Sequence, residues 1–241
     1  MVAPASQCLP IPSPDPAYLA LTVSAMTAAV ALGEVARPKE GEVALVTAAG
    51  GGTGSFAVQL LKRKYGCKVV GTCSSEEKGE YLLSIGCDEY INYKVSREEL
   101  AARMTEVAPD GFHVIYECVG GVLRDVAVEH IAIHGRMVII GGISGYTSGD
   151  AWQSTETDYF FANGLRLLVR RSAAVSGFLL PYYWDVIPTY FEDIKKRFEE
   201  GSVTVRLDPH RLTGLEKVAE AVAYLYTGKS YGKVILNISD E

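Results

Sequence analysis

The chain has 241 residues, of which 48% are hydrophobic and 22% charged, and its formal net charge is −6. This is the length of one large domain, or of one domain and part of another, and the apolar content is enough for a sizeable core, which excludes a disordered or fibrous protein. An acidic chain has no overall field that attracts nucleic acid or an anionic membrane. We therefore expect neither nucleic acid nor a membrane as a partner.

The sequence shows no targeting segment of a familiar kind. The longest apolar run, residues 18–32, is interrupted by Thr22, Ser24 and Thr27 and falls short of the roughly 18 apolar residues that a membrane span needs. Residues 1–16 are rich in proline and carry no Lys or Arg, unlike a signal peptide. The five cysteines are scattered without a C-x-x-C motif, which favours a reducing compartment over a disulfide framework or a cysteine-based zinc site. We expect a cytoplasmic protein.

The first predicted element is a helix that follows a proline-rich, extended tail. Asp15 offers the N-cap of this helix and Pro16 its first position. The pattern predicts that the helix ends near Gly33 or at Arg37.

From Val43 onward, short apolar runs alternate with helical patterns. We predict strands at residues 43–47, 68–72, 89–92, 113–116, 137–140 and 173–177. We predict helices after Gly54 as far as residue 65, and at residues 75–85, 96–107, 122–131 and 184–199. Strands separated by helices in this way indicate βαβ units, and hence an α/β fold with a doubly wound parallel sheet. Beyond Gly201, we expect a strand at 203–207, a helix at 215–226 and a strand at 233–237, in a segment that belongs to a second domain.

The strongest motif is the run from Ala48 to Gly54, which joins the first predicted strand to the next helix. As a G-x-G-x-x-G pattern it has Ala49 in the first place, followed by Gly51 and Gly54. Small residues permit a tight turn, contact between the backbone and a pyrophosphate, and close packing of helix on strand. The N-terminus of the helix then presents N–H groups to the phosphates. The alternative is a flexible glycine-rich connector.

The end of the second predicted strand bears on the choice of cofactor. An NAD site places an acidic residue there to hold the adenosine ribose, but this sequence has Ser74 and Ser75, with Lys78 one helical turn further on. Hydroxyl donors and a cation suit the 2′-phosphate of NADPH. In the alternative interpretation, Ser74 caps the next helix and Glu77 completes a capping box, and both interpretations can hold together.

Two further glycine-containing turns, at residues 118–121 and 141–146, follow the fourth and fifth predicted strands. Open α/β sheets bind ligands at the carboxyl ends of their strands, so these turns are candidates for the nicotinamide half, or else ordinary turns. His130 and His134 have the spacing of two metal ligands on a helix, but no third ligand is near, and we favour a solvated helix terminus. We expect no metal site. The sequence has neither a G-x-S-x-G motif nor a Walker A motif, so it does not support a hydrolase or a kinase.

These motifs, taken in order, resemble one family. The segments concerned are residues 46–60, 71–78, 86–94, 116–121 and 140–146. The chain is similar to the zinc-independent quinone oxidoreductase and prostaglandin reductase branch of the medium-chain dehydrogenases/reductases, over nearly all of residues 14–241. The resemblance implies an NADPH-dependent reductase of activated C=C bonds (enones, 2-alkenals, 15-oxo-prostaglandins) or of quinones, which needs no metal. It also admits a peroxisomal location.

The resemblance implies roles for particular residues. The residues that would meet the pyrophosphate are Gly51, Gly52, Thr53 and Gly54. The residues that would hold the adenosine phosphate are Ser74, Lys78 and Tyr93. The residues that would line the groove and border the nicotinamide ribose are Cys118, Ile140 and Tyr146, and Tyr146 is also the candidate to relay a proton. The residues that would lie over the nicotinamide are Phe178, Leu179 and Leu180. Ser230 falls where relatives often carry Asn.

Relatives carry a GroES-like catalytic domain before the segment that this chain matches. We therefore expect residues 1–14 to be a linker remnant, residues 15–201 the NADPH-binding Rossmann domain and residues 202–241 the C-terminal segment of the catalytic domain. This organisation predicts NADPH binding with little or no turnover.

Three further possibilities follow from the sequence. The predicted strand at 173–177 lies at a sheet edge and could pair with its copy in a homodimer. A non-catalytic NADPH-binding or scaffold module is the alternative function. Tyr90 and Lys94 have the Tyr-x-x-x-Lys spacing of a short-chain dehydrogenase, but they fall on a predicted strand and loop rather than on a helix.

Overall fold

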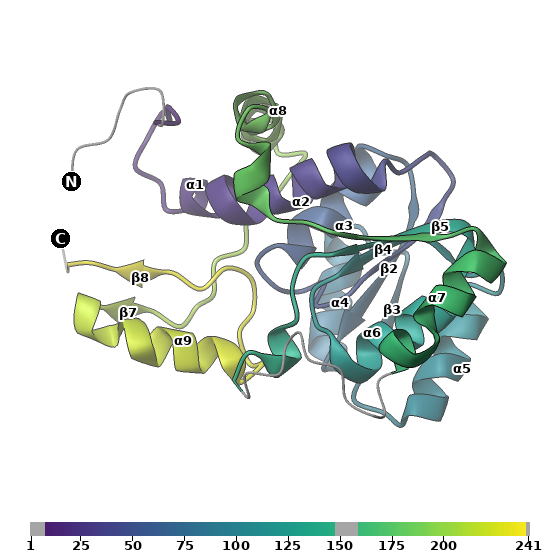
Figure 1. Ribbon diagram of the computed structural model, residues 1–241. Helices are drawn as coiled ribbons and strands as arrows, with labels where there is room; N and C mark the ends of the chain where they lie inside the picture. Colours follow the sequence, from purple (N-terminus) through teal and green to yellow (C-terminus); the bar gives the residue numbers. More distant parts are fainter. Residues whose placement is uncertain (1–7, 148–158, 240–241) are drawn as a thin grey trace.

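The computed structural model describes residues 8–147 and 159–239, and its centre is a six-stranded parallel sheet in the order β3-β2-β1-β4-β5-β6 (Figure 1). The strands are β1 Val43–Val46, β2 Lys68–Cys73, β3 Glu89–Asn92, β4 Phe112–Glu117, β5 Ile131–Ile139 and β6 Ala174–Gly177. The strand order reverses at β1, as in a doubly wound sheet, so the predicted α/β class is confirmed.

Helices cover both faces of this sheet (Figure 1). They are α3 Gly54–Arg63, α4 Glu76–Ile85, α5 Arg97–Val107, α6 Gly121–Glu129, α7 Tyr159–Arg171 and α8 Ile187–Glu199. One apolar cluster lies between the sheet and α3, α4, α8 and the N-terminal helix. The other lies between the sheet and α5, α6 and α7. Burial on both faces explains why the strands read as nearly continuous apolar runs.

The N-terminal helix ends at the second of its two expected ends, because Arg37 is its C-cap. It comprises α1 Ala17–Ala20, η2 Leu21–Ala25, α2 Met26–Val30 and η3 Ala31–Ala36, where the two η segments have π-helical hydrogen bonding. The Asp15 carboxylate accepts the Ala17 N–H at 2.8 Å, as the predicted cap should. Gly33 does not end the helix. Instead, a Cβ at Gly33 would lie 2.0 Å from the Tyr190 hydroxyl, so glycine lets the helix pack closely on α8.

Over residues 17–36, this helix is long and apolar enough to cross a membrane, contrary to the expectation that no run reaches that length. In this structure 61% of its apolar window is buried inside the protein, where it packs against α3 and α8. This helix is therefore part of the protein core, although its length and composition would also suit a membrane-spanning helix.

Between β4 and β6 the expected helix is present as α6, but its end, the start of β5 and an additional helix differ from the expectations. The helix expected at 122–131 ends at Glu129, and β5 begins at Ile131, so His130 and His134 do not share a helix. His134 has φ +59°, and a Cβ at Gly135 would lie 2.9 Å from the Phe112 carbonyl oxygen, so Gly135 belongs to a bulge in the strand rather than to a helix end. Helix α7 was not expected at all.

The C-terminal segment forms a small structure of its own beside the main sheet (Figure 1). It contains η6 Leu215–Lys217, α9 Val218–Tyr226 and a parallel pair of strands, β7 Leu212–Thr213 and β8 Leu236–Asn237. The strand expected at 203–207 is reduced to one bridge between Leu207 and Lys233. This segment contacts the glycine-rich turn, because the Gly232 N–H donates to the Gly50 carbonyl at 3.0 Å. The division at residues 14 and 201 stays a prediction, and residues 1–7 of the expected linker lie outside the described part.

Candidate cofactor site

A cavity of about 330 Å³ crosses the carboxyl ends of β1, β2, β4 and β5. Most of the expected cofactor residues line it: Gly51, Gly52, Thr53, Gly54, Ser74, Lys78, Tyr93, Cys118, Ile140, Tyr146 and Ser230. The described residues that line it include neither Asp nor Glu. The cavity is therefore open to an anionic ligand without repulsion from a carboxylate in its wall.

The floor of the cavity is the glycine-rich turn between β1 and α3. Ala48 has φ +48°, and the Gly51 N–H donates to the Ala48 carbonyl at 2.9 Å, which closes the turn. A Cβ at Gly54 would lie 2.3 Å from the Ala48 carbonyl oxygen, so only glycine fits where the turn enters α3. Ala49 is fully buried and its N–H donates to the Thr72 carbonyl at 3.2 Å, so an alanine serves in the first place of the motif.

The same turn presents unpaired hydrogen-bond donors. Within residues 8–147 and 159–239, the backbone N–H groups of Gly52 and Thr53 have no hydrogen-bond acceptor, and both residues line the cavity. The Thr53 hydroxyl is turned the other way, because it donates to the Ser24 carbonyl at 3.0 Å and shares a hydrogen bond with the Tyr116 hydroxyl. Free N–H groups at the start of a helix fit the pyrophosphate of a dinucleotide.

One end of the cavity lies beyond β2 and carries Ser74, Lys78 and Tyr93. The cap of α4 is Ser75, whose hydroxyl accepts the Lys78 N–H at 3.3 Å, so the alternative in which Ser74 and Glu77 form a capping box is wrong. Ser74 is thus left to line the cavity. The Lys78 ammonium donates to the carbonyls of Gly228 and Ser230, at 2.7 and 3.0 Å, and burial lowers the pKa of Lys78.

The opposite end is formed by the turns after β4 and β5. The Ser144 hydroxyl donates to the Val119 carbonyl at 2.7 Å and ties the two turns together. The Tyr146 hydroxyl accepts the Gly142 N–H at 3.2 Å, and the ring lines the cavity with 43% of the residue exposed. Burial raises the pKa of the Cys118 thiol well above its usual value, so Cys118 acts as a small neutral wall residue.

Phe178, Leu179 and Leu180 do not reach this cavity. They follow β6, on the far side of β5 from the glycine-rich turn. Phe178 is buried and stacks on Tyr183 at a centroid distance of 5.0 Å, while Leu179 is 57% exposed. Their role over the nicotinamide stays a prediction.

Apart from Ser230, the sequence analysis missed the residues that the C-terminal segment contributes to this region. Leu225 and Gly228 line the cavity from α9 and the turn that follows it. Lys233 lies against the glycine-rich turn, because a Cβ at Gly52 would be 3.4 Å from its Cδ. Burial lowers the pKa of Lys233, and no acceptor for its ammonium occurs in the described part of the chain. Only the positive charge of Lys233 could have drawn attention to it.

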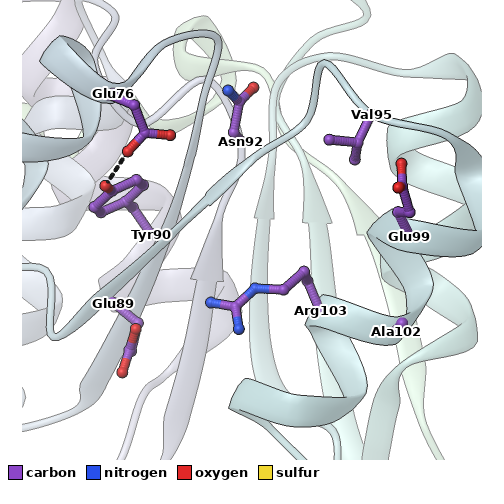
Figure 2. A pocket seen from close by; sticks show the side chains of 8 residues that line it. All are labelled: Glu76, Glu89, Tyr90, Asn92, Val95, Glu99, Ala102 and Arg103. Carbon is purple, nitrogen blue, oxygen red and sulfur yellow. Dashed lines mark hydrogen bonds between the residues drawn. The ribbon is translucent and has the colours of Figure 1, made fainter.

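A second, more open pocket lies at the β3 edge, between β3 and α5 (Figure 2). Glu76, Glu89 and Glu99 give it an acidic lining, and the Tyr90 hydroxyl donates to Glu76 at 2.5 Å. That hydrogen bond raises the pKa of Tyr90, whereas a tyrosine acting as a catalytic acid–base at neutral pH needs a lowered one. Tyr90 lies on β3 and outside the cofactor cavity, which argues against a short-chain dehydrogenase.

The two histidines offer no metal site in the part of the chain that the structure covers. His130 contacts the Val126 carbonyl through Nδ1 and the Thr105 hydroxyl through Nε2, so both ring nitrogens have partners. Among residues 8–147 and 159–239 there is no group of three or more His, Cys, Asp or Glu that could hold a metal ion.

A doubly wound parallel sheet whose first strand ends in a glycine-rich turn at such a cavity defines a dinucleotide-binding protein. The family model described as zinc-binding dehydrogenase matches residues 52–196, more than half of the sequence. The chain belongs to this family of dehydrogenases.

Individual relatives agree with this assignment. The chain is 52% identical to a probable quinone oxidoreductase of Leishmania amazonensis, over 98% of this chain and 68% of the relative. It is 40% identical to prostaglandin reductase-3 of Mus musculus, over 98% of this chain and 63% of the relative. The crystal structure of CurA from Vibrio vulnificus in complex with NADPH superposes with a TM-score of 0.84 at 26% identity, over 95% of this chain and 67% of that one. The resemblance to quinone oxidoreductases and prostaglandin reductases is thus confirmed, and this chain spans about two thirds of their length.

Proposed function

We propose that this chain is the NADPH-binding part of an oxidoreductase that reduces activated C=C bonds, as in enones, 2-alkenals and 15-oxo-prostaglandins, or reduces quinones. The observation that carries the proposal is the cavity in which the glycine-rich turn, Ser74 and Lys78 meet, with neither Asp nor Glu among the described residues of its wall. The printed names of the relatives support it, because they include a quinone oxidoreductase, a prostaglandin reductase and an NADP⁺-dependent 2-alkenal reductase.

The preference for NADPH rests on the end of the cavity beyond β2. A 2′-phosphate there would meet the Ser74 hydroxyl and the Lys78 ammonium, which has three N–H donors and uses two of them on carbonyl groups. The third donor is available for a phosphate oxygen. The pyrophosphate would lie on the N–H groups of Gly52 and Thr53, where the charge of Lys233 adds to the positive end of α3.

The reaction needs orientation more than acid–base chemistry from the protein. NADPH, when bound, would supply a hydride to the β-carbon of the enone and leave as NADP⁺. Tyr146, at the opposite end of the cavity from Lys78, is the candidate to orient the substrate and to pass a proton to the α-carbon of the enolate. Because the match covers about two thirds of the relatives' length, we expect this chain by itself to bind NADPH with little turnover.

Calorimetric titration of NADPH and NADH into the wild type and into Lys78→Ala tests the proposal. A charged hydrogen bond to phosphate contributes about 1.5–3 kcal/mol, so Lys78→Ala should weaken NADPH binding about tenfold or more and leave NADH binding nearly unchanged. Lys62→Ala is the control, since Lys62 pairs with Asp88 at the surface, away from the cavity. Folded protein that gives no heat with either coenzyme would contradict the proposal.

Activity assays distinguish the catalytic proposal from its alternative. NADPH oxidation by an enone or a quinone should proceed in the presence of a chelator, in a form of the protein that carries the catalytic domain of the relatives. NADPH binding without turnover, even in that form, would assign a non-catalytic module instead.

We also propose a homodimer, formed through the free edge of β6, and a cytoplasmic location, with a peroxisomal one as the alternative. The two edges of the sheet differ in charge. Glu76, Glu89 and Glu99 flank the β3 edge, which protects it from pairing, whereas β6 consists of Ala, Val, Ser and Gly and is open on one side. Light scattering measures the mass in solution.

A small molecule, rather than nucleic acid or a membrane, is the expected partner of the site.

A further inference from the structure

Three polar side chains form a row across the centre of the sheet, at the carboxyl ends of its strands. In the register, Val46 of β1 lies beside Gly71 of β2 and beside Tyr116 of β4. The residue that follows each of these three positions in the chain is polar: Thr72 in β2, Thr47 directly after β1, and Glu117 in β4, all fully buried. Two positions earlier, the same face carries apolar residues that pack under α5 and α6: Val70, Leu45 and Ile115. A carboxyl group at the border of this apolar cluster needs a physical explanation.

The Glu117 carboxyl organises the turn that follows β4. Its Oε1 accepts the N–H of Val119 at 2.7 Å and the N–H of Gly120 at 2.8 Å. The adjacent Thr47 hydroxyl accepts the Cys118 N–H at 2.8 Å and lies 3.4 Å from the same Oε1. Three consecutive backbone N–H groups are therefore held by one carboxyl and the hydroxyl beside it.

This arrangement costs stability. Glu117 Oε2 is buried and has no hydrogen-bond partner among the described residues. Burial is also the main reason why the pKa of Glu117 is raised, although the hydrogen bonds from Gly120 and Val119 oppose it. A native protein keeps an unsatisfied buried carboxyl oxygen chiefly where the group serves a site.

The turn that Glu117 holds is part of the cavity wall. Cys118 and Val119 line the cavity, and their carbonyls accept the N–H groups of Ile143 and Ser144, at 3.2 and 3.0 Å. The segment that leads to Tyr146 therefore rests on the same turn. Ser74 follows β2 and the glycine-rich turn follows β1, so the ends of β4 and β5 are left for the nicotinamide half of a dinucleotide.

We propose that Glu117 is a positioning residue that sets the nicotinamide side of the cavity by fixing the backbone of residues 118–120. The proposal rests on the proposed binding of NADPH and goes beyond it, because it assigns the two halves of the ligand to different structural supports. Glu117 itself does not line the cavity and acts through the turn.

The test compares two ligands by calorimetry: NADPH, and adenosine 2′,5′-bisphosphate, which keeps the adenosine 2′-phosphate and lacks the nicotinamide. Glu117→Ala leaves two buried N–H groups without their acceptor, so we expect about tenfold weaker NADPH binding or worse. Binding of the bisphosphate should stay within about twofold of the wild type, because Ser74 and Lys78 are unchanged. The emission of bound NADPH reports the surroundings of the nicotinamide directly and should shift in the same variant.

Two further variants separate positioning from loss of stability. Glu117→Gln keeps an oxygen acceptor for Val119 and Gly120, so it should restore NADPH binding to within about threefold of the wild type. Met104→Ala opens a cavity in the same apolar cluster, remote from the turn, and should lower Tm without changing either affinity. Thr47→Val removes the hydroxyl that holds Cys118 and should reproduce the split between the two ligands if Glu117→Ala does not fold.

The outcomes are distinct. If Glu117→Ala or Thr47→Val weakens both ligands equally, or if Met104→Ala gives the same split between them, the positioning role is wrong while NADPH binding stands. If the wild type binds neither ligand, the proposed function fails first.

Discussion

Gly54 shows how strictly the glycine-rich turn is constrained at a single residue. A Cβ at this position would meet the Ala48 carbonyl oxygen at 2.3 Å and the Ala49 Cα at 2.9 Å, and both are backbone atoms that cannot rotate away. The strand end and the start of α3 are therefore held at a separation that only a hydrogen atom permits. Gly50, four residues earlier, has nothing within 4 Å of its Cβ position.

Gly54→Ala should lower the free energy of unfolding by about 1–3 kcal/mol, because the turn must move to admit a methyl group, and should abolish NADPH binding. Gly50→Ala is the matched control and should change stability by no more than about 0.5 kcal/mol. Urea denaturation and calorimetry measure the two effects. Equal stability of the two variants would show that the turn is not tightly packed.

In the proposed site, Lys233 would favour a ligand at the expense of stability. Its pKa is lowered by burial, so between that lowered pKa and its ordinary 10.5 the unfolded chain binds more protons than the folded one. The free energy of unfolding should therefore rise with pH across this range. Lys233→Met removes the penalty and should stabilise the ligand-free protein at pH 7 by roughly 0.5–1 kcal/mol, while weakening NADPH binding.

Urea denaturation at pH 7 and at pH 10 measures the effect of Lys233→Met, and the gain should shrink at the higher pH. Lys229→Met is the control, since Lys229 is exposed nearby. A stabilised variant with unchanged affinity for NADPH would remove Lys233 from the proposed pyrophosphate site.

At the scale of elements, Arg136 on β5 joins three parts of the fold. Its guanidinium binds both carboxylate oxygens of Glu42, at 2.7 and 2.8 Å, and donates to the Ala36 carbonyl at the end of the N-terminal helix. It also donates to the carbonyls of Arg37 and of His113, which lies on β4. The planar fork of arginine suits this set of acceptors, and the ammonium of lysine cannot match it.

Arg136→Lys should lower the free energy of unfolding by about 1–3 kcal/mol.

Burial alone would raise the pKa of Glu42, but the hydrogen bond and charge of Arg136 lower it below 4.5. Glu42 thus stabilises the fold fully above pH 4.5, and this contribution is lost as the pH falls through the lowered pKa. The difference in urea stability between the wild type and Glu42→Gln should be largest at pH 7 and should shrink below pH 4.5. A difference that grows in acid would refute this pairing.

The elements that the sequence predicted best are those with strong local signals. Strand β3 was predicted at its observed bounds, and α4 begins after Ser75 and ends at Gly86, whose φ of +122° requires glycine. Helix α7 was missed because its sequence pattern is ambiguous: Leu165 and Val169 are apolar yet 81% and 72% exposed, and the helix contains a glycine, Gly164, in its interior. The bulge at His134 depends on contacts between β5 and β4, and the local sequence pattern does not predict contacts between distant residues.

The candidate site likewise has one part that the sequence predicts and another part that it does not. The glycine-rich turn and the position of Lys78 in the cavity wall were predictable because glycine spacing and a serine–lysine pair are local features. Leu225, Gly228 and Lys233 belong to a segment about 150 residues beyond Lys78 that folds back to contact the Lys78 ammonium. The spacing of residues in the sequence does not predict such a long-range contact.

At the scale of the whole molecule, the proposed dimer would form through the edge strand β6. Ala174 is exposed on this strand, and a lysine there would set like charges against each other in a dimer joined edge to edge. Ala174→Lys should give a monomer by light scattering without a change in circular dichroism. Ala102→Lys on the exposed side of α5 should leave the dimer intact. A dimer that survives Ala174→Lys would place the interface elsewhere.

In the proposed site, the two hydrogen bonds from Lys78 to the carbonyls of Gly228 and Ser230 would make the C-terminal segment a partner in coenzyme recognition. A ligand that binds the Lys78 ammonium would also change the hydrogen bonds of residues 228–230. By thermodynamic linkage, a change in the conformation of residues 228–230 would in turn change the affinity for that ligand. Sequence changes that loosen the C-terminal segment will appear as weaker affinity, and saturation with coenzyme will slow amide exchange far down the chain. In this proposal, substitutions in the C-terminal segment outside the cavity wall would change coenzyme affinity without altering a residue that contacts the coenzyme.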